Sequence, residues 1–176
     1  MQLRDGRLFD GDGSRNEQWY GFGSDVVSVA FDGMPEQTPN TPAAGLRGPR
    51  DYSGNHVSLQ ISPGGWAVYA HLQPGSVSVK TGDEVRKGQV IGKLGNSGNS
   101  SGPHLHFQLS DGPEITTSNS LPFSLDSYSL AGAVDPAQLS NATDAKGVPP
   151  PLHVVGPGRQ ESNSYPVMYT VTNLGS

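Results

Sequence analysis

Five histidines carry most of the chemistry that this 176-residue sequence could perform, and two of them lie one residue apart. His104 and His106 flank Leu105 in a segment whose apolar residues favour a β-strand. Side chains at i and i+2 of a strand project from the same face, so the two imidazoles are expected to point together. Neutral imidazole is a good zinc ligand, and two such rings could form half of a metal site. The alternative is a pair of solvent-facing histidines, because this spacing is a weak pattern by itself.

A third histidine, His71, ends the apolar segment 66–72, and strand ends often carry functional side chains. By strand alternation it shares a face with Tyr69. A hydrogen-bonded packing role is the alternative for such a lone histidine. His56 interrupts another apolar segment and His153 lies in a proline-rich stretch, and neither is assigned a function.

The segment 95–102, rich in Gly, Asn and Ser, could be mistaken for a phosphate-binding loop. Gly102 is followed by Pro103 rather than by Lys and Ser or Thr, and a strand rather than a helix is predicted next. Ser97 also lacks the Gly-x-Ser-x-Gly frame of a nucleophile elbow. Because Gly and Asn tolerate left-handed backbone, the segment is predicted to turn sharply and present the next strand.

The elements that must position these residues are predicted to be short strands. β-branched runs and alternating apolar residues are separated by turn residues, and no amphipathic helical period of useful length is present. This pattern favours an all-β fold, a sandwich or barrel. The predicted strands are 25–31, 55–61, 66–72, 76–80, 89–94 and 104–109, with turns at 62–65 and 81–84.

Composition divides the chain into four segments. Within the strand-rich part, residues 34–52 form a long loop rich in Pro and Gly, and such loops near a site are often functional. From about residue 140 onward the Pro- and Gly-rich tail is expected to be loosely ordered, with room for one late strand at 167–171. The expected segments are an N-terminal remnant and loop (1–23), a β core (24–109), a peripheral polar extension (110–139) and the tail (140–176).

Charge and composition exclude several classes of protein. The net charge of −5 gives no basic surface for a phosphate backbone, so nucleic acid is not an expected partner. No run of about 18 apolar residues is present, which excludes a membrane-spanning helix. The absence of cysteine excludes disulfides and thiol catalysis. The first residues lack the pattern of a signal peptide.

Three motifs resemble the lysostaphin-like (LytM-type) peptidoglycan metalloendopeptidases. They are YAHL at 69–72, VKTGDEVRKGQVIG at 79–92 and GNSGNSSGPHLHF at 95–107. Their order and spacing are specific, and the resemblance covers about residues 24–109. It implies an antiparallel β-sheet groove with a metal ion on its floor, in agreement with the strand pattern.

The resemblance implies a role for each histidine of these motifs. His106 would ligate Zn²⁺, and His71 and His104 would flank the metal-bound water and the scissile carbonyl. The reaction would be hydrolysis of a peptide bond in bacterial cell-wall peptidoglycan, with zinc lowering the pKa of its water to about 7. The protein would act as a monomer on peptidoglycan peptides, in the cell envelope or outside the cell. The substrate groove would be lined by Tyr69, Asn99 and Ser100.

The zinc ligand set expected from the resemblance is incomplete in this sequence. The family supplies a His and an Asp from a motif ahead of the first core strand, whereas no histidine precedes His56. Segment 11–17 resembles an insertion that follows this motif in relatives, so both ligands are expected immediately before Met1. Four aspartates could substitute, although turn and cap roles suit them better: Asp5, Asp10, Asp12 and Asp25.

Two functions therefore remain open. The first is a zinc endopeptidase completed by upstream residues, because catalytic zinc needs three protein ligands. The second is a catalytically inactive peptidoglycan-binding or regulatory module of the same fold. A lipoyl- or biotinyl-carrier hairpin, which 79–92 also resembles, ranks last because neither Lys87 nor Lys93 lies at a hairpin tip with a second matching half.

Overall fold

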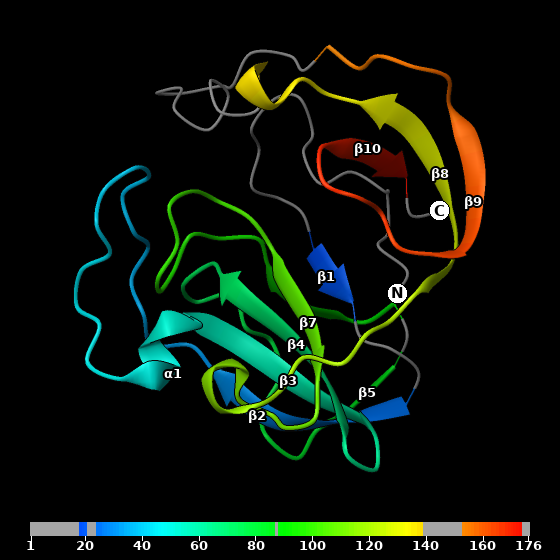
Figure 1. Ribbon diagram of the computed structural model, residues 1–176. Coiled ribbons are helices and arrows are strands. Elements are labelled where there is room, and N and C mark those ends of the chain that lie inside the picture. The colour runs from blue at the N-terminus through cyan, green and yellow to red at the C-terminus, as the bar shows by residue number, and fades with distance from the viewer. Residues whose placement is uncertain (1–17, 21–23, 87, 139–152, 174–176) are drawn as a thin grey trace. The chain divides into compact units, whose positions relative to one another are not determined.

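The computed structural model describes residues 18–20, 24–86, 88–138 and 153–173 (Figure 1). These residues form antiparallel β-sheets with a few short helical turns, among them α1 (Pro49–Tyr52) and η1 (Ile115–Thr117). The prediction of an all-β fold is confirmed. The chain divides into two compact units, residues 15–122 and residues from 123 onward, and the four segments expected from composition stay a prediction. No helix among the described residues has the length and apolar character needed to cross a membrane.

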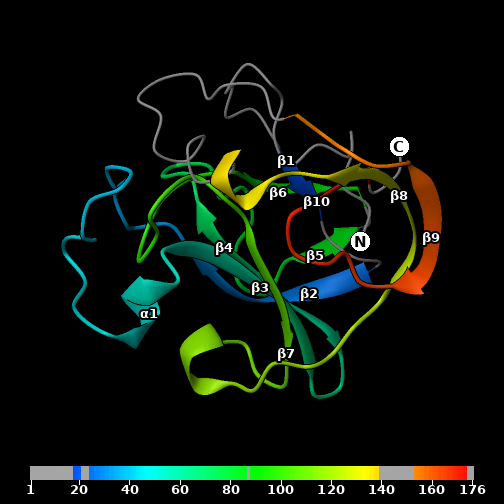
Figure 2. The same ribbon diagram turned by 45° about the horizontal axis from the view of Figure 1, so that its top comes forward.

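The first unit is built on a five-stranded antiparallel sheet with the order β5-β2-β3-β4-β7. β3 and β4 lie side by side within this sheet (Figures 1 and 2) and are joined by the turn predicted at 62–65, where Gly64 has a φ of 74°. Ala70 of β4 pairs with His106 of β7, so the end of one strand meets the start of the other. The strands are β2 (Ser24–Phe31), β3 (Asn55–Ser62), β4 (Gly65–Leu72), β5 (Glu84–Arg86) and β7 (His106–Ser110).

Both faces of this sheet are covered. Consecutive residues are buried from Asn55 to Leu59 in β3 and from Ala67 to Leu72 in β4, whereas a half-exposed strand would alternate. Against one face lies a second sheet of β1 (Gln18–Tyr20) and β6 (Val90–Lys93), where a Cβ on Gly92 would stand 3.0 Å from Cδ1 of Leu72. Burial of each Leu or Val side chain contributes about 1.5–3 kcal/mol.

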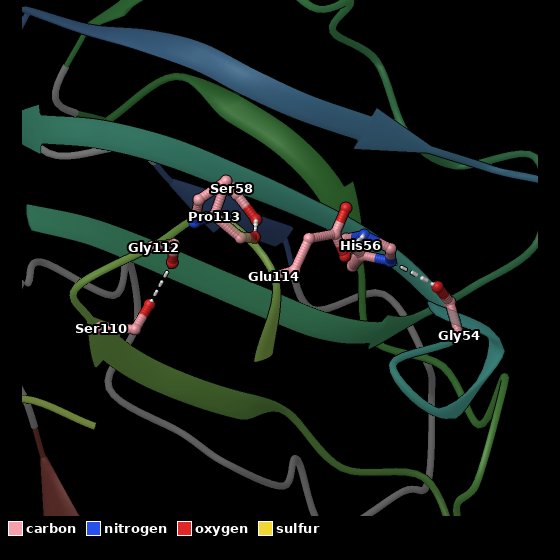
Figure 3. Close-up of polar contacts among 7 residues, drawn as sticks. All are labelled: Gly54, His56, Ser58, Ser110, Gly112, Pro113 and Glu114. Atoms are coloured by element: carbon pink, nitrogen blue, oxygen red, sulfur yellow. Dashed lines mark hydrogen bonds and ion pairs between the residues drawn. The ribbon is translucent and has the colours of Figure 1, made fainter. Parts of the chain in front are cut away.

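The segment after β7 packs against β3 (Figure 3). The hydroxyl of Ser58 donates to the carbonyl oxygen of Pro113 at 2.5 Å. The hydroxyl of Ser110 donates to the carbonyl oxygen of Gly112 at 2.7 Å. Both serines are completely buried. These two bonds hold the segment in place over the strand that carries His56.

One predicted strand is absent from the described residues: the segment 76–80 runs without a ladder. The carboxylate of Asp32 accepts the backbone N–H groups of Gly75 and Val77 at 2.9 and 3.1 Å, so these donors are satisfied without a neighbouring strand. Two serine side chains of the segment bond to the backbone of β6 instead. The alternation of apolar residues was therefore correct for burial but wrong for strand pairing.

Several strand boundaries also differ from the prediction by one or two residues, and β5 is a strand that the pattern does not predict. β5 occupies residues 84–86, overlapping the end of the turn expected at 81–84, because Val26 of β2 pairs with Glu84. β7 begins at His106 rather than at 104. His104 instead forms an isolated bridge with Gly95, across the sharp turn that was predicted there.

The second unit contains a three-stranded antiparallel sheet with the order β10-β8-β9. Leu125, Tyr128 and Leu130 of β8 are buried in it. Part of the segment expected to be loosely ordered therefore forms strands, because β8 offers both of its edges for pairing. Residues 140–152 and 174–176 of that segment lie outside the described residues. The strands are β8 (Leu125–Ala133), β9 (Arg159–Ser164) and β10 (Thr170–Asn173).

Candidate functional site

Three histidines lie together where the end of β4 meets the start of β7. His71 is the penultimate residue of β4, and His106 is the first residue of β7. The ring centroid of His71 lies 4.8 Å from that of His104 and 5.8 Å from that of His106. The structure therefore brings together the three histidines that the motifs singled out, while their individual roles remain predictions.

A β-bulge re-aims His71. The ladder shifts between Asn55 and Val57, so that two residues of β4 face one residue of β3. His71 adopts a φ of 60°, a left-handed conformation that residues with a side chain rarely take. Its backbone N–H donates to the carbonyl of Ser53 at 3.0 Å. Strain of this kind is concentrated at functional sites.

His71 is kept neutral at pH 7 by its surroundings. Its side chain is only 5% exposed, and this burial, together with the charges of His104 and His106, lowers its pKa from 6.5 to about 4. Nδ1 of His71 lies 2.8 Å from the carbonyl oxygen of Ser97, a contact that opposes the shift without reversing it. A neutral imidazole can accept a proton or a hydrogen bond from a reacting group.

The other two rings are each held at one nitrogen. Nδ1 of His104 lies 2.8 Å from the carbonyl oxygen of Gly102 and 3.2 Å from Oγ of Ser100. Nε2 of His106 lies 3.3 Å from Oε1 of Gln108. In each ring the second nitrogen is then left for chemistry at the site.

The residues predicted to line the substrate groove have three different environments. Ser100 is buried and its Oγ lies 3.2 Å from Nδ1 of His104, and its place in the groove stays a prediction. Asn99 is exposed, and its backbone N–H donates to the carbonyl of Tyr52. Tyr69 has no exposed surface and packs edge-on against Phe107, so it is a core residue rather than a groove residue. The expectation failed for Tyr69 because both faces of β4 are buried, and alternation therefore does not identify an open face.

The long loop predicted at 34–52 lies along the turn that presents His104. Gln37 and Asn96 are joined by two bonds of 2.9 Å, backbone to backbone and side chain to backbone. The backbone N–H of Asn40 donates to the carbonyl of Ser101 at 2.8 Å. The loop is thus fixed to the site rather than separate from it.

The described residues do not fit a complete zinc site. Among residues 18–20, 24–86, 88–138 and 153–173, no three His, Asp or Glu side chains are placed to hold a metal ion. His104 and His71 are each engaged at Nδ1 by a carbonyl oxygen. Asp25 is buried in β2, and the other three aspartates considered as substitutes lie outside the described residues.

The two remaining histidines differ from these three in their surroundings, although the charge of His56 also lowers the pKa of His71. His56 is 1% exposed, with Nδ1 2.7 Å from the carbonyl oxygen of Gly54 and Nε2 3.8 Å from Oε2 of Glu114 (Figure 3). Burial lowers its pKa, and Glu114 partly offsets this. His153 is exposed.

Sequence reasoning missed two residues that hold the site together, Asn55 and Ser97. Both are completely buried, and the backbone N–H of Asn55 donates to Oγ of Ser97 at 2.9 Å. Each lies next to a glycine of positive φ, Gly54 or Gly98. For Asn55, a polar residue between a glycine and an apolar strand pattern was the available signal, whereas Ser97 lies in a segment rich in Gly, Asn and Ser that offered none.

Comparison with known proteins bears on the same region. Residues 43–118 match the family model described as peptidase family M23. Peptidoglycan DD-endopeptidase ShyA of Vibrio cholerae is 38% identical over 83 residues, which are 47% of this chain and 17% of that protein. Glycyl-glycine endopeptidase ALE-1 of Staphylococcus capitis is 45% identical over 58 residues, 31% of this chain and 15% of that protein. The chain thus spans less than a fifth of the length of these curated relatives.

Among solved structures, the catalytic domain of lysostaphin from Staphylococcus simulans is 27% identical, with a TM-score of 0.35, covering 58% of this chain and 70% of that one. The family resemblance inferred from the three motifs is confirmed by the family match and the sequence relatives.

Proposed function

We propose, from the premise that residues 43–118 carry the segment shared by peptidase family M23, that this protein is an endopeptidase acting on the peptides of bacterial cell-wall peptidoglycan. The observation that carries the proposal is the cluster of His71, His104 and His106, with His71 neutral at pH 7. The names of the relatives, a DD-endopeptidase and a glycyl-glycine endopeptidase, support the substrate class. The protein would then work in the cell envelope or outside the cell.

Each histidine has its own role in this proposal. His106 is the zinc ligand, as the family resemblance implies, and it opens β7 beside the ring of His71. His71 and His104 contact the substrate side of the site, where they accept hydrogen bonds or protons and orient the scissile peptide. A positioned acid or base of this kind contributes about 10²- to 10⁴-fold to the rate. Zinc dependence is part of the proposal, although the described residues supply only one of its ligands.

The test measures zinc and hydrolysis in parallel. The 176-residue chain and a form extended upstream in the same reading frame are purified, dialysed and assayed for bound zinc and for release of soluble peptides from peptidoglycan. New amino termini in the products, read by mass spectrometry, identify the bond that is cut. We expect well under one equivalent of zinc in the 176-residue chain, and one equivalent with hydrolysis in the extended form. An extended form that holds zinc yet leaves peptidoglycan intact would contradict the proposal.

The second candidate is a catalytically inactive module that binds peptidoglycan peptides. The absence of a three-ligand cluster among the described residues favours it. In that case both forms sediment with insoluble peptidoglycan and release nothing. Binding without hydrolysis in both forms is therefore the result that distinguishes the module from the enzyme.

A further inference from the structure

Ser97 contacts the peptide next to His71 and the ring of His71 at the same time. Its carbonyl oxygen lies 2.8 Å from Nδ1 of His71, and its hydroxyl donates to the carbonyl of Leu72 at 2.7 Å. We propose that Ser97 is the positioning residue of His71: its carbonyl selects the tautomer, and its hydroxyl holds that carbonyl in place. This rests on the proposed function, in which His71 acts on the substrate.

The carbonyl half of the proposal follows from donor and acceptor chemistry. A carbonyl oxygen only accepts, so the neutral ring of His71 must carry its proton on Nδ1 and present Nε2 as the acceptor. Free histidine in water prefers the opposite tautomer. The 5% exposure of His71 leaves little room for water to compete for Nδ1. The protein therefore imposes the less common tautomer on a ring that it also keeps neutral.

The hydroxyl half follows from the two bonds made by Oγ of Ser97. It donates to the carbonyl of Leu72, the residue directly after His71, and accepts the backbone N–H of Asn55 at 2.9 Å. Leu72 at the end of β4 and Asn55 at the start of β3 are paired in the ladder, and the bulge lies between this pair and the next one. One hydroxyl thus ties both strand ends to the turn that carries the Ser97 carbonyl.

The backbone of Gly54 lies close against the Ser97 carbonyl. A Cβ on Gly54 would lie 2.4 Å from the Ser97 oxygen, and a Cβ on Gly98 would lie 2.4 Å from the Gly54 nitrogen. Both glycines have positive φ, 63° and 76°. A side chain at either glycine would therefore displace the turn that carries this carbonyl, and the Ser97 hydroxyl acts within a closely packed backbone.

The orientation of an active-site histidine is worth a large factor in rate. In the serine protease triad, placing the wrong tautomer costs about 10⁴-fold in kcat with the geometry intact. Ser97 acts through His71 and does not itself touch substrate in this proposal. A measurement of the His71 tautomer, rather than of stability, therefore distinguishes a positioning role of Ser97 from a merely structural one.

The experiment is long-range ¹⁵N–¹H NMR of the histidine rings in the full chain at pH 8, where His71 is neutral. The His71 signals are assigned by their loss in His71→Gln. The variants are Ser97→Ala and the matched control Ser110→Ala, which also removes a completely buried hydroxyl that donates to a carbonyl at 2.7 Å. Unfolding midpoints in urea are recorded for both.

We expect the Nδ1–H tautomer of His71 in the wild type and in Ser110→Ala, and a mixture containing Nε2–H in Ser97→Ala, even if both variants lose similar stability. An Nε2–H tautomer in the wild type overturns the carbonyl half. An unchanged tautomer in Ser97→Ala overturns the hydroxyl half. If Ser97→Ala does not fold, Ser97→Thr is measured in its place. Because Thr keeps the hydroxyl, this variant must keep the Nδ1–H tautomer of His71, and a change to Nε2–H would also overturn the hydroxyl half. None of these outcomes depends on hydrolysis, so a failure of the proposed function is seen separately.

Discussion

Replacement of Gly54 by alanine tests how closely the backbone is packed beneath the histidine cluster. Gly54 has a φ of 63°, and an added Cβ would lie 2.4 Å from the carbonyl oxygen of Ser97 and 2.6 Å from its Oγ. A left-handed conformation costs a residue with a Cβ about 1–2 kcal/mol. Forcing a packed backbone apart adds about 1–3 kcal/mol. We therefore expect Gly54→Ala to lower the free energy of unfolding by about 2–5 kcal/mol.

Gly64→Ala is the matched control. Gly64 has a similar φ of 74°, but nothing lies within 4 Å of the position that its Cβ would take. This variant should lose only the conformational part, about 1–2 kcal/mol. The difference between the two variants isolates the close approach of Gly54 to Ser97.

Urea unfolding followed by tryptophan fluorescence measures both variants. Trp19 and Trp66, the two tryptophans of the chain, belong to the unit of residues 15–122 that contains both glycines. The slope with urea must be equal in all three proteins for the comparison to hold. Equal losses in the two variants would refute the reasoning, because the contact with Ser97 would then cost nothing.

Two further predictions concern pH and metal. Burial lowers the pKa of His56, with a smaller contribution from Arg50. Below about pH 6.5 the folded state therefore binds fewer protons than the unfolded state. The stability that His56 contributes is complete above that pH and is lost as the pH falls. Glu114 opposes this shift, so Glu114→Gln should steepen the acid loss in urea titrations between about pH 5 and 7 while changing little at pH 8; an unchanged pH profile would contradict it. In a form that binds zinc, His106→Ala should lose metal and activity together, whereas His104→Ala should keep most of the zinc and lose about 10²- to 10⁴-fold in turnover. Zinc lost from His104→Ala and kept by His106→Ala would reverse the two roles.

Much of the fold could be predicted because its strands obey simple periodicity. The β3–β4 hairpin lies within one or two residues of the predicted positions, since its turn contains Pro63 and two glycines. The segment 76–80 could not be predicted in the same way. Its alternation is genuine, but its backbone donors have separate partners: the carboxylate of Asp32, more than forty residues earlier, accepts the N–H of Val77, and the carbonyl of Ile91 accepts that of Ser78. Pairing over such distances leaves no local pattern.

The candidate site divides along the same line. The histidines could be predicted because their residue type and spacing suit a metal site. The pair of His104 and His106 is a weak pattern by itself, and the order of the three motifs made it specific. The bulge at His71 was not found, because alternation assumes one residue per rung of the ladder. That one extra residue explains why His71 leaves the pattern that Tyr69 follows into the core. Departures from local rules of this kind are expected at functional sites.

The strain at His71 must be balanced by other interactions, and Asn55 is the residue placed to do so. Its side chain makes four hydrogen bonds, accepting from the N–H groups of Gly33 and Met34 and donating to the carbonyls of Met34 and Leu72. At about 0.5–1.5 kcal/mol each, these bonds contribute about 2–6 kcal/mol. One residue in an unfavourable backbone region costs about 1–3 kcal/mol. The bonds of this buried asparagine, one of which reaches Leu72 directly after His71, are therefore of the magnitude needed to offset the strain of the bulge.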